Sequence, residues 1–273
     1  MTRAARFPAR TANVAGMQDH EVAIAAAAAG AEAVRERYGT ALGRVAKGGG
    51  DFATEADLAA EAAVLAVLRE HRPGDAVTGE EGGARGPAGA VRRWLVDPLC
   101  GTLNYAVRTP LVAVNVALRD GDDVAVAAAA DPFAGEIFWT DGASARVRRG
   151  GTDHQLTPSA GSALVDVNLD PPYPRHPALL LAAPAFAERF RPRVLSTTLA
   201  LLWVADGRRA AYVTYGDLRD SVHFAAGIAV CRAAGCVVTG IEGQPLHTGA
   251  GGLLAAADES THAALRAIVT VSA

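Results

Sequence analysis

The stretch Trp94-Leu95-Val96-Asp97-Pro98-Leu99-Cys100-Gly101-Thr102-Leu103-Asn104-Tyr105 decides the fold of this chain. Its first three residues are apolar and are typical of a short buried strand. Gly101 and Thr102 indicate the start of a helix, so Cys100 lies just before a helix N-terminus. Backbone N–H groups at such a position favour an anion. Asp97 and Cys100 are two residues of this stretch whose side chains could take part in chemistry.

The composition is that of an ordinary globular protein. The chain has 273 residues, of which 50% are hydrophobic and 20% charged, enough for one large domain or two packed lobes. A net charge of -3 argues against a nucleic-acid surface. The three cysteines have no regular spacing, which favours a reducing cytoplasm, and no apolar run reaches the roughly 18 residues of a membrane span. We therefore expect a cytoplasmic protein with no nucleic-acid or membrane partner.

The residue pattern predicts alternating helices and strands, and hence a layered α/β fold. Helices are expected at residues 19–38, 54–70, 178–190, 197–205 and 224–234. Strands are expected at residues 76–78, 94–96, 111–118, 124–130, 137–140, 162–168 and 210–215. Residues 1–16 lack the apolar core of a signal peptide and read as a flexible extension. Turn residues at 141–160 suggest a boundary between an N-terminal α+β lobe, 17–145, and a C-terminal α/β lobe, 146–273.

Several ordered motifs resemble one family. Residues 97–105 resemble the signature D-P-x-D-G-T-x-N-[FY] of the inositol monophosphatase family, metal-dependent phosphatases for small molecules. Four further segments match that family in the same order: Lys47 to Asp57, Gly79-Glu80-Glu81, Asp131-Pro132 with Gly135-Glu136, and Ser196 to Gly207. The resemblance runs from about residue 46 to 238. It implies a layered α-β-α-β-α sandwich, often dimeric, and we expect a homodimer that binds a small-molecule substrate.

The resemblance also implies roles for individual residues. Glu80 and Asp97 would hold a first Mg²⁺ together with the Leu99 carbonyl. Asp57 and Thr102 would orient the attacking water, and the backbone N–H groups of Gly101 and Thr102 would bind phosphate. From the sequence itself, Lys47 beside three glycines is expected either in a loop that closes over the substrate or as a solvated surface residue. In the family, Asp97 and the residues at positions 100 and 223 would hold a second metal.

Two of those family ligands differ in this chain. Position 100 is Cys, and the Asp of the downstream family motif W-D-x-A-A-G falls on His223, although a one-residue shift would put Val222 there. Mg²⁺ prefers oxygen ligands, which neither thiol nor imidazole supplies. Asp220, three residues earlier, could replace the missing ligand or contact the substrate.

Covalent catalysis is our leading hypothesis for this rewired centre. Cys100 would be the nucleophile of a hydrolase or of an acyl or group transferase, and the helix start would lower the pKa of its thiol. His223 would be the general base and Asp97 its orienting acid, as in a catalytic triad. Gly101 and Thr102 would form the oxyanion hole. This hypothesis requires no cofactor.

Two other hypotheses stay open. A phosphate monoesterase could use Zn²⁺ held by Asp97, Cys100 and His223, with an open position for water. The same activity could instead use a single Mg²⁺ at Glu80 and Asp97. A non-catalytic binding protein that has lost phosphatase activity would keep the fold and the ligand pocket.

Overall fold

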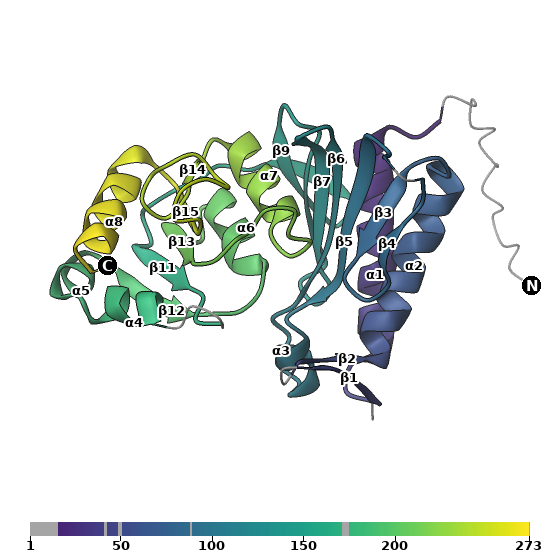
Figure 1. The fold of residues 1–273 in the computed structure, drawn as a ribbon, viewed down its shortest axis with the longest axis horizontal. Coiled ribbons are helices and arrows are strands. Elements are labelled where there is room, and N and C mark those ends of the chain that lie inside the picture. The colour runs from purple at the N-terminus through teal and green to yellow at the C-terminus, as the bar shows by residue number, and fades with distance from the viewer. Residues whose placement is uncertain (1–15, 41–42, 49–50, 88, 171–174, 273) are drawn as a thin grey trace, which may run out of the picture.

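The computed structural model describes residues 16–40, 43–48, 51–87, 89–170 and 175–272 (Figure 1). The extension expected at residues 1–16 falls almost wholly outside this part. The helices are α1 (Asp19–Arg37), α2 (Glu55–His71), α3 (Thr102–Ala106), α4 (Arg175–Ala182), α5 (Pro184–Arg189), α6 (Leu199–Ala205), α7 (Ala225–Ala234) and α8 (Glu259–Ser272).

The strands of the described residues form three sheets. A two-stranded sheet pairs β1 (Arg44–Gly48) with β2 (Asp51–Thr54). An eight-stranded sheet has the order β10-β9-β8-β7-β6-β5-β3-β4, and a five-stranded sheet has the order β12-β11-β13-β15-β14. The bounds in the eight-stranded sheet are β3 (Ala76–Gly79), β4 (Gly83–Arg85), β5 (Arg92–Cys100), β6 (Ala113–Asp120), β7 (Asp123–Asp131), β8 (Glu136–Thr140), β9 (Ala145–Arg149) and β10 (Thr152–Gln155). Those in the five-stranded sheet are β11 (Leu164–Val167), β12 (Arg191–Val194), β13 (Ala211–Thr214), β14 (Val237–Thr239) and β15 (Leu253–Ala256).

The alternation of side chains along β5, β6 and β7 produces the first three layers. Trp94, Val96 and Val116 point to one face of the eight-stranded sheet and pack under α1 and α2. Leu95 and Ala117 point to the other face, against α6 and α7. Because successive side chains of a strand alternate between faces, one run of apolar residues can serve both cores.

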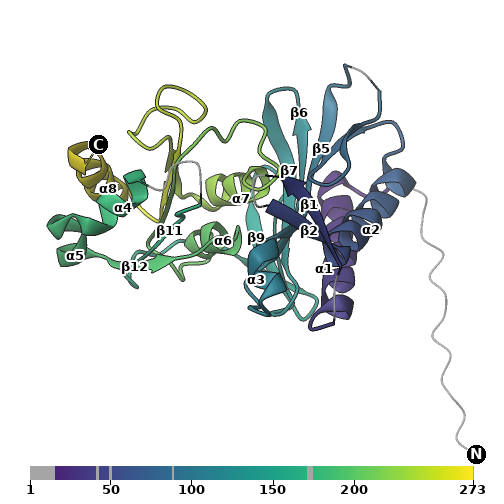
Figure 2. The same ribbon diagram turned by 60° about the horizontal axis from the view of Figure 1, so that its bottom comes forward.

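The five-stranded sheet completes the sandwich. One of its faces, with Tyr212 and Leu253, shares the core of α6 and α7. Its other face, with Val213 and Leu254, packs against α4, α5 and α8. Figure 2 shows α6 and α7 between the two large sheets, as in Figure 1. The layers therefore follow the order α-β-α-β-α, and the predicted fold class is confirmed.

A β-bulge in β5 positions the candidate site. Asp97 pairs with Asn115 of β6, but Cys100 pairs with Ala113, so β5 holds one extra residue between the two pairs. In a regular strand, residues three apart point to opposite faces, and an extra residue reverses that phase. Asp97 and Cys100 therefore both point toward α7. Gly101 follows with a φ of 106°, and a Cβ there would lie 2.9 Å from the Leu111 carbonyl oxygen, so the turn into α3 requires glycine.

Three sequence-based expectations differ from the structure. Asp97 and Cys100 lie within β5, because the bulge lets the strand continue past Pro98. Residues 141–160 hold the hairpin of β9 and β10, which extends the eight-stranded sheet to Gln155. The helix expected at residues 178–190 is divided into α4 and α5, since Pro184 lacks the N–H that a continuous helix needs. The division of the chain into two lobes at residue 145 stays a prediction.

No helix in the described ranges combines the length and the apolar character that a membrane span requires.

Candidate active site

Asp97 lies at the centre of the candidate site and is fully buried, with 0% of its surface exposed. Its Oδ1 accepts a hydrogen bond from the backbone N–H of Leu99 at 3.1 Å. Its Oδ2 accepts one from the Asn115 side chain at 3.3 Å and lies 2.8 Å from Nδ1 of His223. A buried carboxylate is stable only when such partners satisfy it. The carboxyl orientation is therefore fixed by β5, β6 and the segment before α7.

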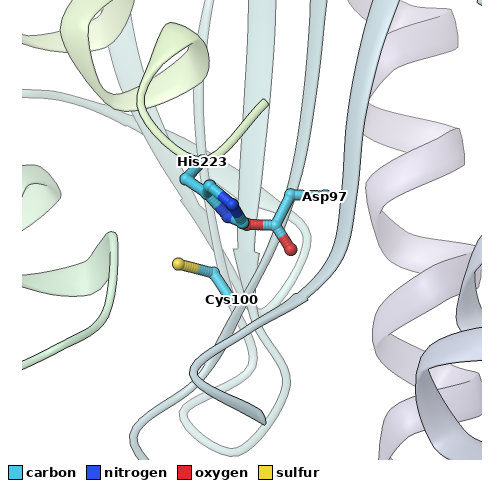
Figure 3. A group of neighbouring side chains, drawn as sticks. All are labelled: Asp97, Cys100 and His223. Carbon is cyan, nitrogen blue, oxygen red and sulfur yellow. The ribbon is translucent and has the colours of Figure 1, made fainter. Parts of the chain in front are cut away.

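His223 faces Asp97 from the loop that leads into α7 (Figure 3). The neighbouring Val222 packs with the apolar core instead. Of the two candidates, His223 is therefore the side chain that lies in the site. Its side chain is 44% exposed, whereas Asp97 is covered, so the site opens to solvent on the side of the imidazole.

Cys100 is half-buried and contacts Thr198, which immediately precedes α6. The Thr198 hydroxyl lies 3.0 Å from Sγ of Cys100 and 2.8 Å from the His223 carbonyl oxygen, and it accepts a hydrogen bond from Asn115 at 3.0 Å. A hydroxyl has one proton to donate, so it can serve either the sulfur or the carbonyl at one time. Thr198 thus links both sides of the site.

The electrostatics of the pair oppose a thiol nucleophile. Burial raises the pKa of the Cys100 thiol, and the negative charge of Asp97 raises it further. Burial lowers the pKa of His223, but the adjacent Asp97 carboxylate outweighs it and raises that pKa to about 12. His223 and the Thr198 hydroxyl lower the pKa of the thiol, but burial and Asp97 prevail and the net direction is upward. The site therefore does not favour a thiolate at Cys100.

Glu80 brings a second carboxyl to Asp97. It follows β3, its side chain is hydrogen-bonded to Asp97, and its Oε2 lies 4.0 Å from Nδ1 of His223. Two carboxyl groups this close repel each other when both are ionised, so a positive charge beside them stabilises the pair, and His223 lies near both. Beneath them the buried Glu61 of α2 accepts the backbone N–H of Glu81 at 2.9 Å and so fixes this turn.

Asp57 and Thr102 form a second polar pair beside the bulge. Thr54 and Asp57 make a capping box at the start of α2, with the Thr54 N–H and hydroxyl donating to Oδ2 of Asp57 at 2.8 and 2.6 Å. The Thr102 hydroxyl lies 2.9 Å from the other oxygen, Oδ1, and 3.2 Å from the Leu99 carbonyl oxygen. Burial raises the pKa of Asp57, while its hydrogen bonds act in the opposite direction.

Two expected substrate residues are not placed with this group. Asp220 is exposed, adopts a φ of 56° and pairs with Arg119. Lys47 belongs to β1, but its side chain lies outside the described residues. Their roles stay predictions.

Asn115, Thr198 and Glu61 are contacts that the sequence did not suggest. Asn115 is an isolated polar residue in an apolar strand, and its buried position could have marked it. Thr198 falls in a segment that already carried the family resemblance, immediately before α6. Glu61 is a buried acid on the apolar face of α2.

Comparison with known proteins shows which family shares this sequence and fold. The model of the inositol monophosphatase family matches residues 17–272. An inositol-1-monophosphatase from Caulobacter vibrioides is 30% identical over 213 residues, covering 72% of this chain and 78% of the relative. Inositol-1-monophosphatase ImpA from Mycolicibacterium smegmatis is 35% identical over 237 residues, 78% of each protein. A crystal structure of the extragenic suppressor protein suhB from Bartonella henselae superposes with a TM-score of 0.80 at 25% identity, covering 91% of this chain and 97% of that one.

These relatives correct the leading sequence-based hypothesis. They are named as phosphoric monoester hydrolases, so the expectation of a cysteine-nucleophile hydrolase or transferase with a catalytic triad is wrong. The expectation of no cofactor is also wrong, because the phosphatases of this family depend on Mg²⁺. The physical reason lies in the site itself: burial raises the pKa of the Cys100 thiol and the charge of Asp97 raises it further, which disfavours the thiolate that a nucleophile needs.

Proposed function

We infer the function from one premise: this chain belongs to the inositol monophosphatase family. We propose that it is a metal-dependent phosphoric monoester hydrolase that acts on a small polar phosphomonoester. The contact between Glu80 and Asp97, beside the pair of Thr102 and Asp57, supports this function most directly. Expected partners beyond a small-molecule substrate, including the homodimer, stay predictions.

The donors on the β3 and β5 side fit a hard cation. Glu80 and Asp97 offer carboxylate oxygens, and the Leu99 carbonyl lies on the same bulge. Mg²⁺ prefers such oxygen ligands. When bound, the cation would polarise the phosphate oxygens and neutralise the charge that develops on them. Cys100 and His223 do not fit Mg²⁺, because thiolate and imidazole are softer donors.

The chain itself would position the attacking water. The Thr102 hydroxyl donates to Asp57, so the lone pairs of its oxygen can accept a hydrogen bond from a water molecule. Asp57 holds this hydroxyl because its own carboxylate is fixed by the capping box of α2. Its pKa, raised by burial, favours acceptance of the proton that the water loses. Gly101 and Thr102 would present backbone N–H groups to the phosphate.

The test is phosphate release from a panel of small phosphomonoesters, inositol 1-phosphate among them because of the relatives' names. Purified full-length protein would be stripped of metal and assayed with Mg²⁺, Mn²⁺ or Zn²⁺. We expect release that a chelator abolishes. Glu80→Gln should lower kcat/KM about 10³-fold, because the loss of a charged metal ligand costs several kcal/mol. Glu242→Gln, at an exposed acid of the C-terminal half, is the matched control.

Absence of phosphate release from folded protein with all three metals would overturn the proposal. Binding of the esters without turnover would instead favour the non-catalytic binding protein.

A further inference from the structure

Cys100 and His223 do not fit Mg²⁺, yet they lie together with Asp97. The carboxylate oxygen, the sulfur and a ring nitrogen of these residues all lie within 4.8 Å of one another. Among the described residues, this is the one group of three or more His, Cys, Asp or Glu side chains with that property. Figure 3 shows Asp97 and Cys100, which end β5, with His223 approaching Asp97 from the loop before α7. Three separate ligand atoms thus surround one point.

The chemistry of these donors selects a class of metal. Zinc sites that retain an open position commonly have three protein ligands drawn from His, Cys and carboxylates. Thiolate and imidazole also bind Co²⁺ and related transition metals, but both are poor ligands for Mg²⁺. The set of one oxygen, one sulfur and one nitrogen therefore favours Zn²⁺ over Mg²⁺, whereas three carboxylates would favour Mg²⁺.

The surroundings hold each ligand in place. Asn115 donates to Oδ2 of Asp97 and to the Thr198 hydroxyl, and that hydroxyl lies 3.0 Å from Sγ of Cys100. The Leu99 N–H fixes the other oxygen of Asp97. Outer hydrogen bonds of this kind orient metal ligands and strengthen binding. The 44% exposure of His223 leaves a path from solvent to the group.

The other two free cysteines provide a contrast. Cys231 is fully buried in α7, where its Sγ lies 3.1 Å from the Leu201 carbonyl oxygen, and Cys236 is buried just before β14. Both belong to an apolar core cluster, as free cysteines usually do. Cys100 differs because its sulfur faces a carboxylate, an imidazole and a hydroxyl.

We propose that Asp97, Cys100 and His223 form a zinc site that discriminates against Mg²⁺. The metal would bind the thiolate and the neutral imidazole, so Zn²⁺ binding releases the Cys100 thiol proton and the imidazolium proton of His223 to solvent. This inference concerns metal binding and does not require that the protein turns over a phosphate ester. Asp97 would be shared with the hard cation of the proposed phosphatase.

The test is metal binding by the full-length, metal-stripped protein. Zn²⁺ affinity would be measured by calorimetry against a competing chelator, and Co²⁺ would be added as a spectroscopic probe. We expect a thiolate-to-Co²⁺ charge-transfer band in the near ultraviolet, which Zn²⁺ removes and millimolar Mg²⁺ does not. Cys100→Ser should abolish the band and weaken Zn²⁺ binding more than about 100-fold, since loss of an outer-shell partner alone costs about 10- to 100-fold.

Three further variants separate a ligand from a structural residue. His223→Gln should weaken Zn²⁺ binding but keep the thiolate band with Co²⁺ at saturating concentration. Cys236→Ser and the exposed His154→Gln should leave both readouts unchanged. Circular dichroism would verify the fold of each variant. If Cys100→Ser does not fold, Thr198→Val provides the second test, in which we expect the Co²⁺ charge-transfer band to shift and the Zn²⁺ affinity to fall.

The inference is overturned if wild-type protein gives no thiolate band, or if folded Cys100→Ser binds Zn²⁺ as tightly as wild type. Phosphate release with Mg²⁺ in a protein that gives no band would overturn the zinc site alone. A zinc site in a protein that releases no phosphate would overturn the proposed function alone.

Discussion

The two walls of the site obey different chemistry. One wall, formed by Glu80, Asp97, Asp57 and Thr102, offers only oxygen atoms. The second wall, called the facing wall because His223 approaches from the loop before α7, consists of His223 and of Cys100 at the end of the same strand β5, and it offers sulfur and nitrogen. Asp57 and Asp97 are fully buried, whereas His223 is 44% exposed. A rigid scaffold can therefore keep one set of ligand atoms while substitutions alter which metal the other set would prefer.

Asp97 contributes ligand atoms to the metal positions at both walls. The variant Asp97→Asn should therefore have the largest effect, because it weakens metal binding at both. We expect kcat/KM for phosphate release to fall about 10³-fold or more, because the loss of one charged ligand weakens both metal positions by several kcal/mol. The Co²⁺ spectrum should lose intensity at the same time. The exposed Asp122→Asn is the control, and a normal spectrum in Asp97→Asn would show that the walls act separately.

Replacing both soft donors would make the two walls alike. In the double variant Cys100→Asp and His223→Asp, three carboxylates would surround the same point, and such a set prefers Mg²⁺. We expect Mg²⁺ affinity to rise about tenfold or more, with loss of the thiolate band. Calorimetry with Mg²⁺ and Zn²⁺ would measure the exchange. Unchanged Mg²⁺ affinity in the folded double variant would show that the donors do not determine the preference.

Thr102→Val tests the oxygen wall without touching a metal ligand of the facing wall. The substitution removes the hydroxyl that contacts Asp57 at 2.9 Å, so the water would lose its orienting partner. We expect kcat to fall about 10²-fold, the scale of general acid–base assistance, and stability to fall by about 1 kcal/mol. Zn²⁺ affinity should stay the same. The exposed Thr152→Val is the control, and a loss of Zn²⁺ binding in Thr102→Val would contradict the separation.

The pair of Asp97 and His223 makes stability depend on pH in the metal-free protein. The folded-state pKa of His223, about 12, exceeds its ordinary value of 6.5. The contribution of His223 to the free energy of unfolding is therefore complete below pH 6.5 and is lost as pH rises toward 12. Burial raises the pKa of Asp97, but His223 and the other partners of the carboxylate outweigh burial and lower that pKa. The stabilisation that Asp97 contributes is therefore complete above pH 3.8 and is lost at lower pH. The pair of Asp97 and His223 therefore stabilises the folded protein most between pH 3.8 and 6.5.

Thermal unfolding of wild type and His223→Gln across pH would measure this window. The difference in Tm should be largest near pH 5 and shrink toward pH 9, while His154→Gln should follow wild type throughout. A difference that grows with pH would mean that the imidazole is neutral in the folded protein.

Asp220→Asn should have the smallest effect. Asp220 is exposed and pairs with Arg119 at the surface, where an ion pair contributes about 1 kcal/mol or less. We expect kcat/KM and Zn²⁺ affinity to change less than about twofold. A tenfold loss of Zn²⁺ affinity would instead make Asp220 a fourth ligand.

The sequence predicted the fold well where local signals and family motifs coincide. The helix at residues 19–38 and the hairpin of β6 and β7 follow from periodicity and a turn, and both are present. The hairpin of β9 and β10 was missed because its residues are polar and turn-rich, and only pairing with β8 makes them strands. Long-range pairing cannot be read from such a segment alone.

The residues of the site could be found from the sequence, but their chemistry could not. The family resemblance placed Asp97, Cys100 and His223 together. The pKa of the thiol was predicted in the wrong direction, because burial of the thiol and then the charge of Asp97 raise it, and α3, with only five residues, does not offset them. Asn115 and Thr198 emerged only from the register of β5 with β6 and from the approach of α6.

The single extra residue in β5 also determines which changes the site tolerates. It sets the direction of position 100 through the backbone, so the side chain there can be exchanged without moving the strand. Together with the half-buried His223, position 100 is a place in this chain where a substitution can change the ligand atoms of the site without moving the strand. Deleting Leu99 would restore the regular alternation and leave Cys100, then two residues after Asp97, on the same face of the sheet. It would, however, remove the backbone N–H that contacts Asp97 and the carbonyl that contacts Thr102, so a change of length in the bulge would damage the site where a point substitution would not.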